Sequence, residues 1–276
     1  MDDQVRKDAS LTRNPESRDT TGNRSGTQAI QRATRILKEI GAAGTRGLRV
    51  VDLCERLPIE RPTLHRMLTC LADEKMIARD ERSKRYFLGD SIYKLGLAAA
   101  GRFNLRDICE TPLTRISNAT GDTVFLATLG DNDGIVLDKR DGPNPIRTMP
   151  LEIGMRRPLG VGSTGLAMLS ALPDVEIDRI IKENSRRLRE HNVRPDKLPS
   201  LIARSRKNGY AFSRGYGPPR ICGVALPLQN GSDRCIGAIS VTALSHRMTS
   251  EHRQDVLAIL RKELAPVTQK LRNLRD

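Results

Sequence analysis

Tryptophan is absent from the 276-residue sequence, and phenylalanine and tyrosine contribute only four side chains each. Proteins that recognise single-stranded RNA stack unpaired bases on aromatic rings, so this composition disfavours an RNA-binding function. No apolar run approaches the roughly 20 residues needed to span a bilayer, and the basic start lacks the apolar segment of a signal peptide. We therefore expect a cytoplasmic protein without a membrane partner.

Residues that commonly carry catalysis or bind metals are sparse and scattered. The four histidines show no H-x-x-x-H spacing, and no Gly-x-Ser-x-Gly turn is present. The five cysteines contain no C-x-x-C pair, which disfavours a zinc site or a redox dithiol. We therefore predict reduced core cysteines, no bound metal or cofactor, and no enzyme activity. The residues concerned are His65, His191, His246 and His252, and Cys54, Cys70, Cys109, Cys222 and Cys235.

Acidic side chains are outnumbered by basic ones, 33 to 47, which gives a formal net charge of +14 and a pI near 10.1. The excess is uneven. Residues 27–106 carry 16 basic and 9 acidic side chains, whereas residues 107–276 carry 26 and 19 over a much longer stretch. Such a charge favours a polyanionic partner through counterion release, a trait that ribosomal and membrane-surface proteins share.

The N-terminal third has the pattern of a winged helix-turn-helix. Residues 1–26 are polar with almost no apolar content, which predicts a disordered tail. Apolar spacing then predicts a helix that ends at Gly41, followed by two further helices. A charged turn between residues 76–79 and 85–88 indicates a β-hairpin. We assign the winged helix-turn-helix to residues 27–89.

The third helix has a polar face opposite its apolar stripe, which includes Leu64 and Leu68. Such a face suits the major groove, where arginine can bond guanine O6 and N7 together. A solvated charged surface would look the same, but the short preceding helix and the following hairpin favour DNA binding. The predicted DNA contacts are Arg61, Pro62, Thr63, His65, Arg66 and Thr69 in the helix and Arg82, Lys84 and Arg85 in the hairpin.

The rest of the chain has an α+β pattern. Apolar residues at helical spacing predict a linker or dimerisation helix over residues 90–106. Residues 107–276 then predict a domain with a mainly antiparallel sheet and flanking helices. The expected strands are 123–129, 134–139, 221–228 and 235–243, and the expected helices are 163–171, 175–183, 197–208 and 250–274.

Residues 160–165 match the G-x-G-x-x-G fingerprint of dinucleotide sites and open an apolar helix. The preceding residues 155–159 hold two arginines and a proline instead of a buried parallel strand, and no acidic residue ends a second strand further on. We therefore reject dinucleotide binding. Two interpretations remain: a glycine loop that permits close helix packing, and a helix N-terminus that binds the carboxylate of a small metabolite.

Motifs in both predicted domains point to one family. They are Gln28-Ala29-Ile30-Gln31-Arg32-Ala33, Pro62-Thr63-Leu64-His65-Arg66-Met67-Leu68, Arg85-Tyr86-Phe87-Leu88-Gly89, Gly154-Met155-Arg156-Arg157-Pro158-Leu159, Asn208-Gly209-Tyr210-Ala211 and Gly237-Ala238-Ile239-Ser240-Val241. Over residues 28–274 the chain resembles the isocitrate lyase regulator (IclR) family of bacterial repressors and activators. The resemblance implies a GAF/PAS-like effector-binding domain behind the winged helix-turn-helix. It also implies a homodimer or dimer of dimers that binds a double-stranded DNA operator and responds to a small organic-acid effector.

The resemblance further implies an effector pocket in residues 107–276. Its expected residues are Ser163 and Thr164 at loop amides, Ser213 and Gly223 on one wall, Ser240 and Thr242 on a strand, and Met149, Leu151 and Met155 as an apolar lid. For these residues an ordinary core or strand role is the alternative. The sequence departs from the family at Ser213, where Asp is frequent, at Gly223, where Cys is frequent, and at Pro62, where Ser is usual. A second interpretation of residues 107–276, a small-molecule enzyme, lacks clustered acids or nucleophiles.

Overall fold

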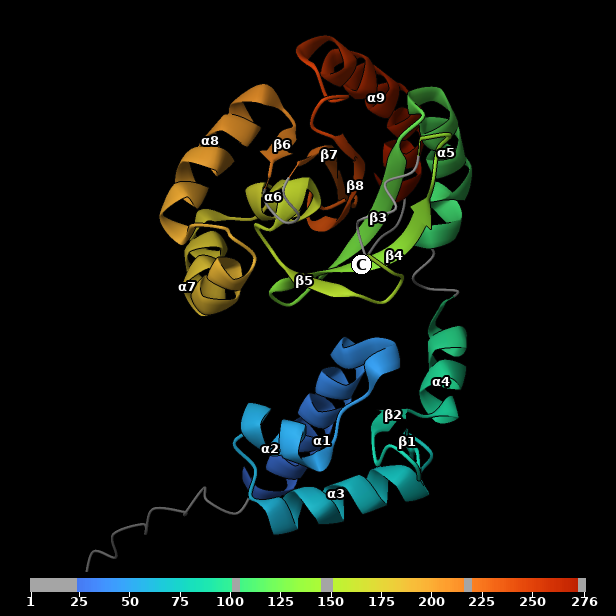
Figure 1. Cartoon of the computed structure of the whole chain (residues 1–276), viewed down its shortest axis with the longest axis vertical. Helices are drawn as coiled ribbons and strands as arrows, with labels where there is room; N and C mark the ends of the chain where they lie inside the picture. The colour runs from blue at the N-terminus through green and yellow to red at the C-terminus, as the bar shows by residue number, and fades with distance from the viewer. Residues whose placement is uncertain (1–23, 101–104, 145–150, 216–219, 273–276) are drawn as a thin grey trace, which may run out of the picture.

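The computed structural model describes residues 24–100, 105–144, 151–215 and 220–272. A helical unit with a two-stranded hairpin lies at one end of the long axis, and a larger unit around a six-stranded sheet lies at the other (Figure 1). The arrangement confirms the predicted α+β class with an N-terminal helix-turn-helix. Within the described ranges, no helix is both long enough and apolar enough to cross a membrane.

The N-terminal unit packs around apolar residues that recur at helical spacing. Ile36, Ile40, Leu53, Leu64 and Leu68 are each at most 1% exposed, and each contributes about 1.5–3 kcal/mol by burial. The elements are α1 (Arg24–Ala43), the short 3-10 helix η2 (Gly44–Arg46), α2 (Val50–Arg56), α3 (Arg61–Asp73), β1 (Ile77–Arg79) and β2 (Tyr86–Leu88).

Helix α1 begins inside the segment predicted as a tail. The helix starts at Arg24, whereas the apolar spacing indicates a start near residue 28. Residues 24–27, Arg-Ser-Gly-Thr, include no large apolar side chain, so this first turn gives no apolar signal in the sequence. The remainder of the predicted tail, residues 1–23, lies outside the described residues.

Gly47 joins the helices to the hairpin. Its φ is +58°, and a Cβ at this position would lie 2.7 Å from the Phe87 ring and 2.9 Å from the Tyr86 carbonyl oxygen. Only glycine permits this approach. The Leu48 amide donates to the Tyr86 carbonyl at 3.1 Å, and the Tyr86 amide donates to the Leu48 carbonyl at 2.7 Å. The hairpin is therefore fixed to the turn that follows α1.

Helix α4 (Asp90–Ala100) leads from the N-terminal unit to the larger unit, in which α5 (Leu105–Thr120) is the first helix. Helix α4 covers most of the predicted linker helix, and residues 101–104 lie outside the described ranges. No sequence pattern above predicts α5, which contains Pro112 in its interior. Proline removes a helix hydrogen bond, and packing compensates here because α5 buries one whole face.

The larger unit is built on an antiparallel sheet in the order β5-β4-β3-β8-β7-β6. The four central strands agree with the predicted ones, and the short edge strands β5 and β6 are additional. The bounds are β3 (Thr123–Gly130), β4 (Asp133–Arg140), β5 (Arg156–Pro158), β6 (Ala211–Arg214), β7 (Ile221–Gln229) and β8 (Cys235–Leu244).

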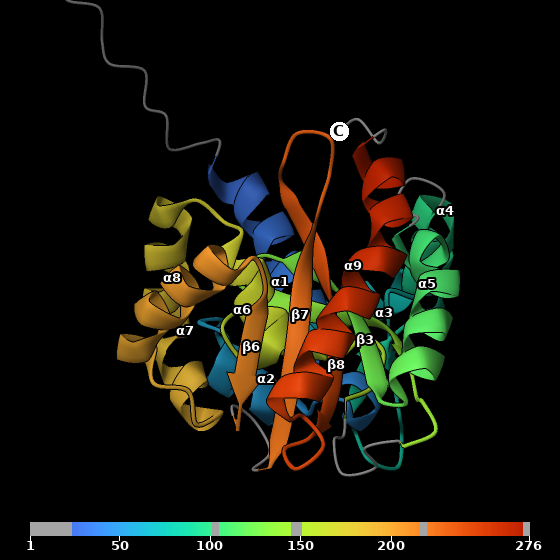
Figure 2. The ribbon, with the colours of Figure 1, turned by 90° about the horizontal axis from the view of Figure 1, so that it is seen from above.

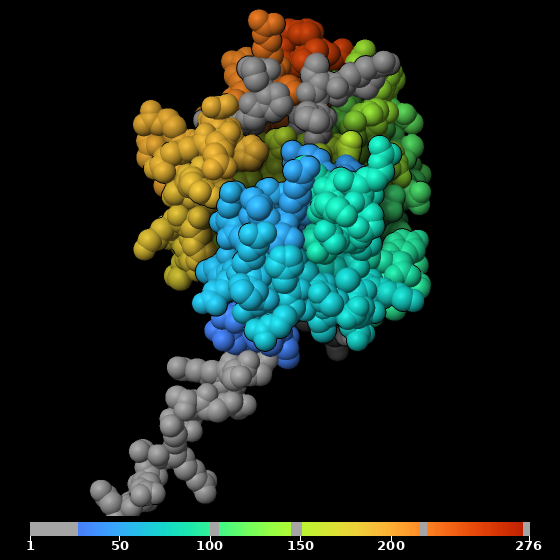
Figure 3. All heavy atoms as spheres, turned by 60° about the horizontal axis from the view of Figure 1, so that its bottom comes forward, coloured from blue at the N-terminus to red at the C-terminus, as the bar shows by residue number. Residues whose placement is uncertain are grey.

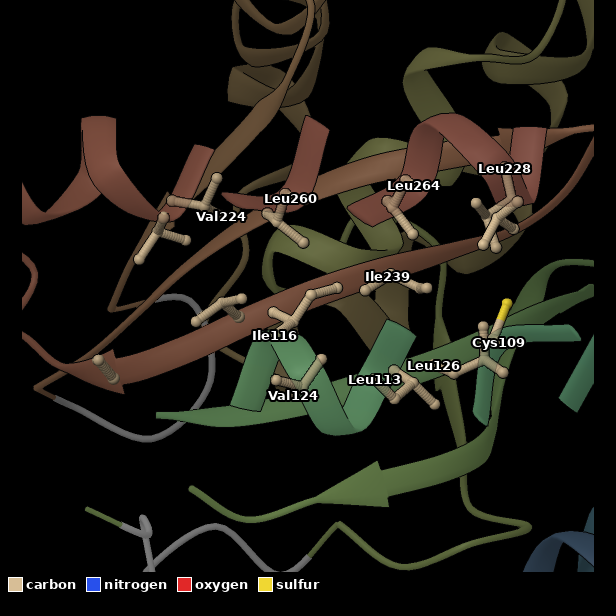
Figure 4. Packing of buried hydrophobic residues seen from close by; sticks show 14 of the residues in the cluster. Cys109, Leu113, Ile116, Val124, Leu126, Val224, Leu228, Ile239, Leu260 and Leu264 are labelled. Carbon is tan, nitrogen blue, oxygen red and sulfur yellow. The ribbon is translucent and has the colours of Figure 1, made fainter. Parts of the chain in front are cut away.

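Helices cover both faces of the sheet (Figures 1 and 2). Helices α6 (Gly162–Ser170), α7 (Asp174–Glu190) and α8 (Leu198–Asn208), with η3 (Pro195–Lys197) before α8, lie on one side. Helices α5 and α9 (Ser250–Arg272) lie on the other, where Leu113, Ile239 and Leu260 pack together (Figure 4). Side chains alternate along a strand, so Ser240 and Thr242 face α6.

Candidate functional site

Helix α3 buries one face and exposes the other. Leu64 and Leu68 point into the core, while His65, Arg66 and Thr69 are exposed. Arg61 and Pro62 are also exposed and form the first turn, where proline is tolerated because its missing amide has no helical partner. Thr63 is half-buried. The helix lies at the far end of the molecule from the six-stranded sheet (Figure 1), and the unit that carries it is turned to the viewer in Figure 3.

A groove between α1 and α3 adds a cation that the sequence analysis does not single out. The groove has a volume of about 420 Å³, and Arg32 of α1 and Arg66 of α3 line it together. Within the described residues, neither arginine forms an ion pair with a carboxylate. Their charges are therefore available to an external anion such as a phosphate. The groove is lined by Gln28, Ala29, Arg32, Thr63, Arg66, Met67 and Cys70.

The turn of the hairpin is held by local hydrogen bonds. The Ser83 amide and hydroxyl each donate to Asp80 Oδ1 at 2.6 Å, and these bonds hold the pKa of Asp80 below its usual value. Lys84, with a φ of +56°, pairs with Glu81 at 2.9 Å. Arg82 is exposed and has no ion-pair partner among the described side chains. Arg82 therefore projects from the hairpin as an accessible cation, and Lys84 is exposed beside it in its pair with Glu81.

Arg85 does not project from the hairpin with them. Its Nη1 donates to the Gly47 carbonyl at 3.0 Å and to the Arg46 carbonyl at 3.3 Å. The side chain is half-buried. The structure thus places Arg85 as a bond between the hairpin and the turn after α1, and its role as a DNA contact stays a prediction.

A second site lies between the sheet and the N-terminus of α6. It is a cavity of about 60 Å³, far smaller than the roughly 300–1,000 Å³ that drug-sized ligands occupy. Most of its walls are apolar, and hydroxyl groups and one arginine supply the polar contacts. The lining consists of Phe125, Ala127, Gly134, Val136, Leu151, Arg157, Val161, Gly162, Ser163, Thr164, Gly165, Met168, Ser213, Ile221, Cys222, Gly223 and Thr242.

Three of the expected effector contacts form a row across neighbouring strands. Ser213 of β6 pairs with Gly223 of β7, which pairs in turn with Thr242 of β8. Directly paired residues share one face of a sheet, so all three positions face the cavity. Ser213 and Thr242 are each 5% exposed, so their hydroxyls are sheltered from bulk water.

The N-terminus of α6 closes the other side of the cavity. Ser163 and Thr164 stand in its first turn, where backbone amides lack helical partners and attract negative charge. The Thr164 hydroxyl donates to Ser240 Oγ at 2.7 Å. Ser240 is fully buried behind Thr164 and is absent from the lining among the described residues.

The predicted apolar lid is only partly found at the cavity. Leu151 lines it, whereas Met155 packs against the cluster of Phe125, Val136 and Leu151 without lining the cavity. Met149 lies outside the described residues.

Arg157 is the charged residue of the described lining, and the sequence does not predict it as an effector contact. It lies on β5 and is half-buried, and burial lowers the pKa of its guanidinium. Arginine remains protonated despite such a shift, so the side chain brings a positive charge to the cavity. A three-residue strand is too short to show an alternation of apolar and polar residues. The sequence therefore does not indicate on which face of the sheet the Arg157 side chain lies.

Comparison with known proteins gives matches to both units. Residues 29–81 match the family model "IclR helix-turn-helix domain", and residues 97–267 match "Bacterial transcriptional regulator IclR C-terminal". The HTH-type transcriptional regulator XynR of Escherichia coli is 25% identical over 223 residues, which cover 80% of this chain and 88% of that protein. The transcriptional repressor IclR of Escherichia coli is 22% identical over 245 residues, covering 87% and 89%.

Solved structures share the fold. An IclR family transcriptional regulator from Brucella abortus has a TM-score of 0.74 at 21% identity, covering 90% of this chain and 94% of that one. An IclR homolog from Microbacterium hydrocarbonoxydans, complexed with 4-hydroxybenzoate, has a TM-score of 0.69 at 20% identity, covering 88% and 99%. These identities are low, so the likeness concerns the fold.

Proposed function

The chain belongs to the IclR family of bacterial transcriptional regulators, and we propose that it reads a specific operator through α3 under the control of a small organic acid. The matched domains and relatives are DNA-binding regulators and not enzymes, which confirms that part of the sequence-based prediction. The proposal adds the identity of the reading surface, the chemical class of the effector, and a site of action in the cytoplasm.

The exposed face of α3 is the observation that carries the operator proposal. Arg61, His65 and Arg66 are exposed on a helix whose other face is buried, and no ion pair within the described residues engages their side chains. In the major groove these donors meet base edges, while Arg82 and Lys84 of the hairpin meet the phosphate backbone. Arg32 adds a further phosphate contact beside Arg66.

The cavity beneath α6 supports a small carboxylate as effector. Its polar groups are hydroxyls, helix amides and an arginine, and no acidic side chain stands among its lining in the described part of the chain. Such a site repels cations and attracts anions. The Microbacterium homolog binds 4-hydroxybenzoate, a carboxylate, in the same fold, and this is consistent with the proposed class.

We further propose that two copies act together, as a homodimer or a dimer of dimers. Tyr93 and Leu97 stand one helical turn apart on α4 and are 68% and 57% exposed. An apolar helix face of this kind favours a second copy of the chain. Two α3 helices would then read half-sites of a roughly palindromic operator about one DNA turn apart.

A gel-shift titration of the full-length protein against its upstream intergenic DNA tests the operator proposal. We expect specific binding that weakens steeply as salt rises, because phosphate contacts release counterions. Addition of short carboxylic acids is expected to change the midpoint of that titration. Equal affinity for the upstream DNA and for unrelated DNA of the same length would contradict operator recognition.

A further inference from the structure

Arg157 shares the face of the sheet that looks toward α6. It pairs directly with Gly134 across β5 and β4. A Cβ at Gly134 would lie 2.5 Å from Met168 Cε of α6, so side chains at these two paired positions point toward that helix. Paired residues project to the same side of a sheet, and Arg157 accordingly lines the cavity together with Met168. The absence of a side chain at Gly134 leaves space for the end of the Met168 side chain.

Among the described residues no carboxylate pairs with Arg157, in contrast to its neighbour Arg156. Arg156 Nε lies 3.0 Å from Asp133 Oδ2, and Arg187 Nη1 lies 2.8 Å from Asp133 Oδ1. Asp133 thus forms ion pairs with two arginines, and neither of them lines the cavity. No ion pair forms at Arg157 within the described ranges. A sheltered guanidinium without an anion is costly in free energy, and a bound anion removes that cost.

No other side chain in the described lining of the cavity supplies a negative charge to Arg157. His191 follows the end of α7, and its pKa is lowered chiefly by burial and then by the positive charges of Arg157 and Arg187. A lowered pKa keeps the imidazole neutral at pH 7, so His191 adds no second cation to the cavity. Among the described lining residues, none is Asp or Glu and Arg157 is the single charged side chain.

We infer that Arg157 is the anchor for the effector's carboxylate and that the site selects acids with one carboxylate over neutral or doubly charged analogues. This inference rests on the proposed effector function and adds the residue that sets its selectivity. The guanidinium presents two parallel N–H donors that match the two oxygens of a carboxylate. In the described part of the lining, a second carboxylate would find hydroxyls and apolar walls but no second cation. The Ser213 and Thr242 hydroxyls also line the cavity and can bind a hydroxyl or keto group of the same ligand.

Binding of matched probes to the full-length protein tests the inference. The probes are lactate and benzoate, their amides lactamide and benzamide, and the dicarboxylate malonate, each measured by calorimetry and by thermal shift. We expect the wild type to bind a monocarboxylate more tightly than its amide and than malonate. Arg157→Met keeps the length of the apolar stem and removes the charge, and we expect an affinity loss of about 10- to 100-fold for the acid. Arg157→Lys should retain part of the affinity.

The neighbouring arginine provides the matched control. Arg156→Met removes an equal charge from the same strand, and we expect it to lower the melting temperature while the preference for acid over amide remains. If Arg157→Met binds the acid as tightly as the wild type does, Arg157 is no anchor and the inference is overturned while the proposed effector class stands. If neither lactate nor benzoate binds the wild type, both the proposed effector class and the inference are contradicted. Should Arg157→Met fail to fold, an unchanged acid-over-amide ratio in Arg157→Gln overturns the inference equally.

Discussion

The hydroxyl of Ser163 occupies the space that a side chain at Gly223 would need. A Cβ built at position 223 would lie 2.3 Å from Ser163 Oγ and 3.2 Å from Ser163 Cβ. The two residues come from α6 and β7 and meet at the cavity wall. A cysteine at position 223 would therefore clash with the Ser163 hydroxyl. The glycine at position 223 is thus matched by the presence of Ser163 opposite.

Gly223→Ala is expected to lower the free energy of unfolding by about 1–2 kcal/mol, because the added methyl group overpacks a closed wall. Combining it with Ser163→Ala should restore much of that loss, because the nearest atom is then gone. Urea denaturation of the single and double variants measures the coupling. Gly96→Ala is the control: nothing lies within 4 Å of its Cβ position in α4, so it should leave stability unchanged or raise it by up to about 1 kcal/mol. Additive effects at 163 and 223 would show that the two residues do not compete for space.

The sequence predicts most of this fold because the spacing of apolar residues in long amphipathic segments indicates whether each is a helix or a strand. Helices α2 and α3, the hairpin and the four central strands all agree with periodicity of apolar residues. Helix α5 is not predicted because Pro112 and several Ser and Thr residues interrupt its apolar pattern. Its buried residues Leu105, Cys109 and Leu113 are nevertheless spaced four apart, as in a helix. The edge strands β5 and β6 are not predicted because three or four residues are too few to show an alternation of apolar and polar side chains.

A candidate site is predictable from the sequence where the periodicity of a helix or strand determines which way a side chain points. The exposure of His65 and Arg66 follows from the helical period, and the structure agrees. The direction of Arg85 depends on contacts with Arg46 and Gly47, nearly 40 residues earlier in the chain, and no local pattern encodes them. The position of Arg157 likewise depends on strand pairing with Gly134.

Arg66→Ala is expected to weaken binding to the operator by about 1–3 kcal/mol if the guanidinium reads a base, and to reduce discrimination at one position of the site. The side chain is exposed on α3, so the substitution should not alter stability. Fluorescence anisotropy with operator and with scrambled DNA measures both quantities. Arg189→Ala, an exposed arginine on α7, is the matched control and should bind as the wild type does. Unchanged operator affinity for Arg66→Ala would remove this residue from the reading surface.

Arg82→Ala and Arg85→Ala are expected to differ although they are close in sequence. Arg82 is exposed, so its loss should reduce the slope of log affinity against log salt by about one without changing stability. Arg85 donates to two backbone carbonyls, so its loss should lower the free energy of unfolding by about 1–2 kcal/mol. Salt titration of DNA binding and urea denaturation separate the two effects. A stable Arg85→Ala variant with a reduced salt slope would instead make Arg85 a direct phosphate contact.

The buried cysteines should resist alkylation in the folded protein. Burial raises the pKa of the Cys109 thiol to about 12 and that of Cys235 to about 11, whereas Cys70 is exposed. Since the thiolate is the nucleophile, iodoacetamide at pH 8 should label Cys70 first and leave Cys109 and Cys235 intact until the chain is denatured, as peptide mass spectrometry can follow.

The same shifts give a pH dependence of stability with a definite sign. The folded state retains the protons of Cys109 and Cys235 above pH 9, the ordinary value at which the unfolded chain loses them. The unfolded state therefore binds fewer protons, and the free energy of unfolding falls as pH rises from about 9 toward 12. Because lysine and tyrosine also titrate there, the Cys109→Ala/Cys235→Ala variant is the reference: its stability, lower at pH 8, should decline less steeply. Parallel declines for the variant and the wild type would show that these two thiols do not contribute.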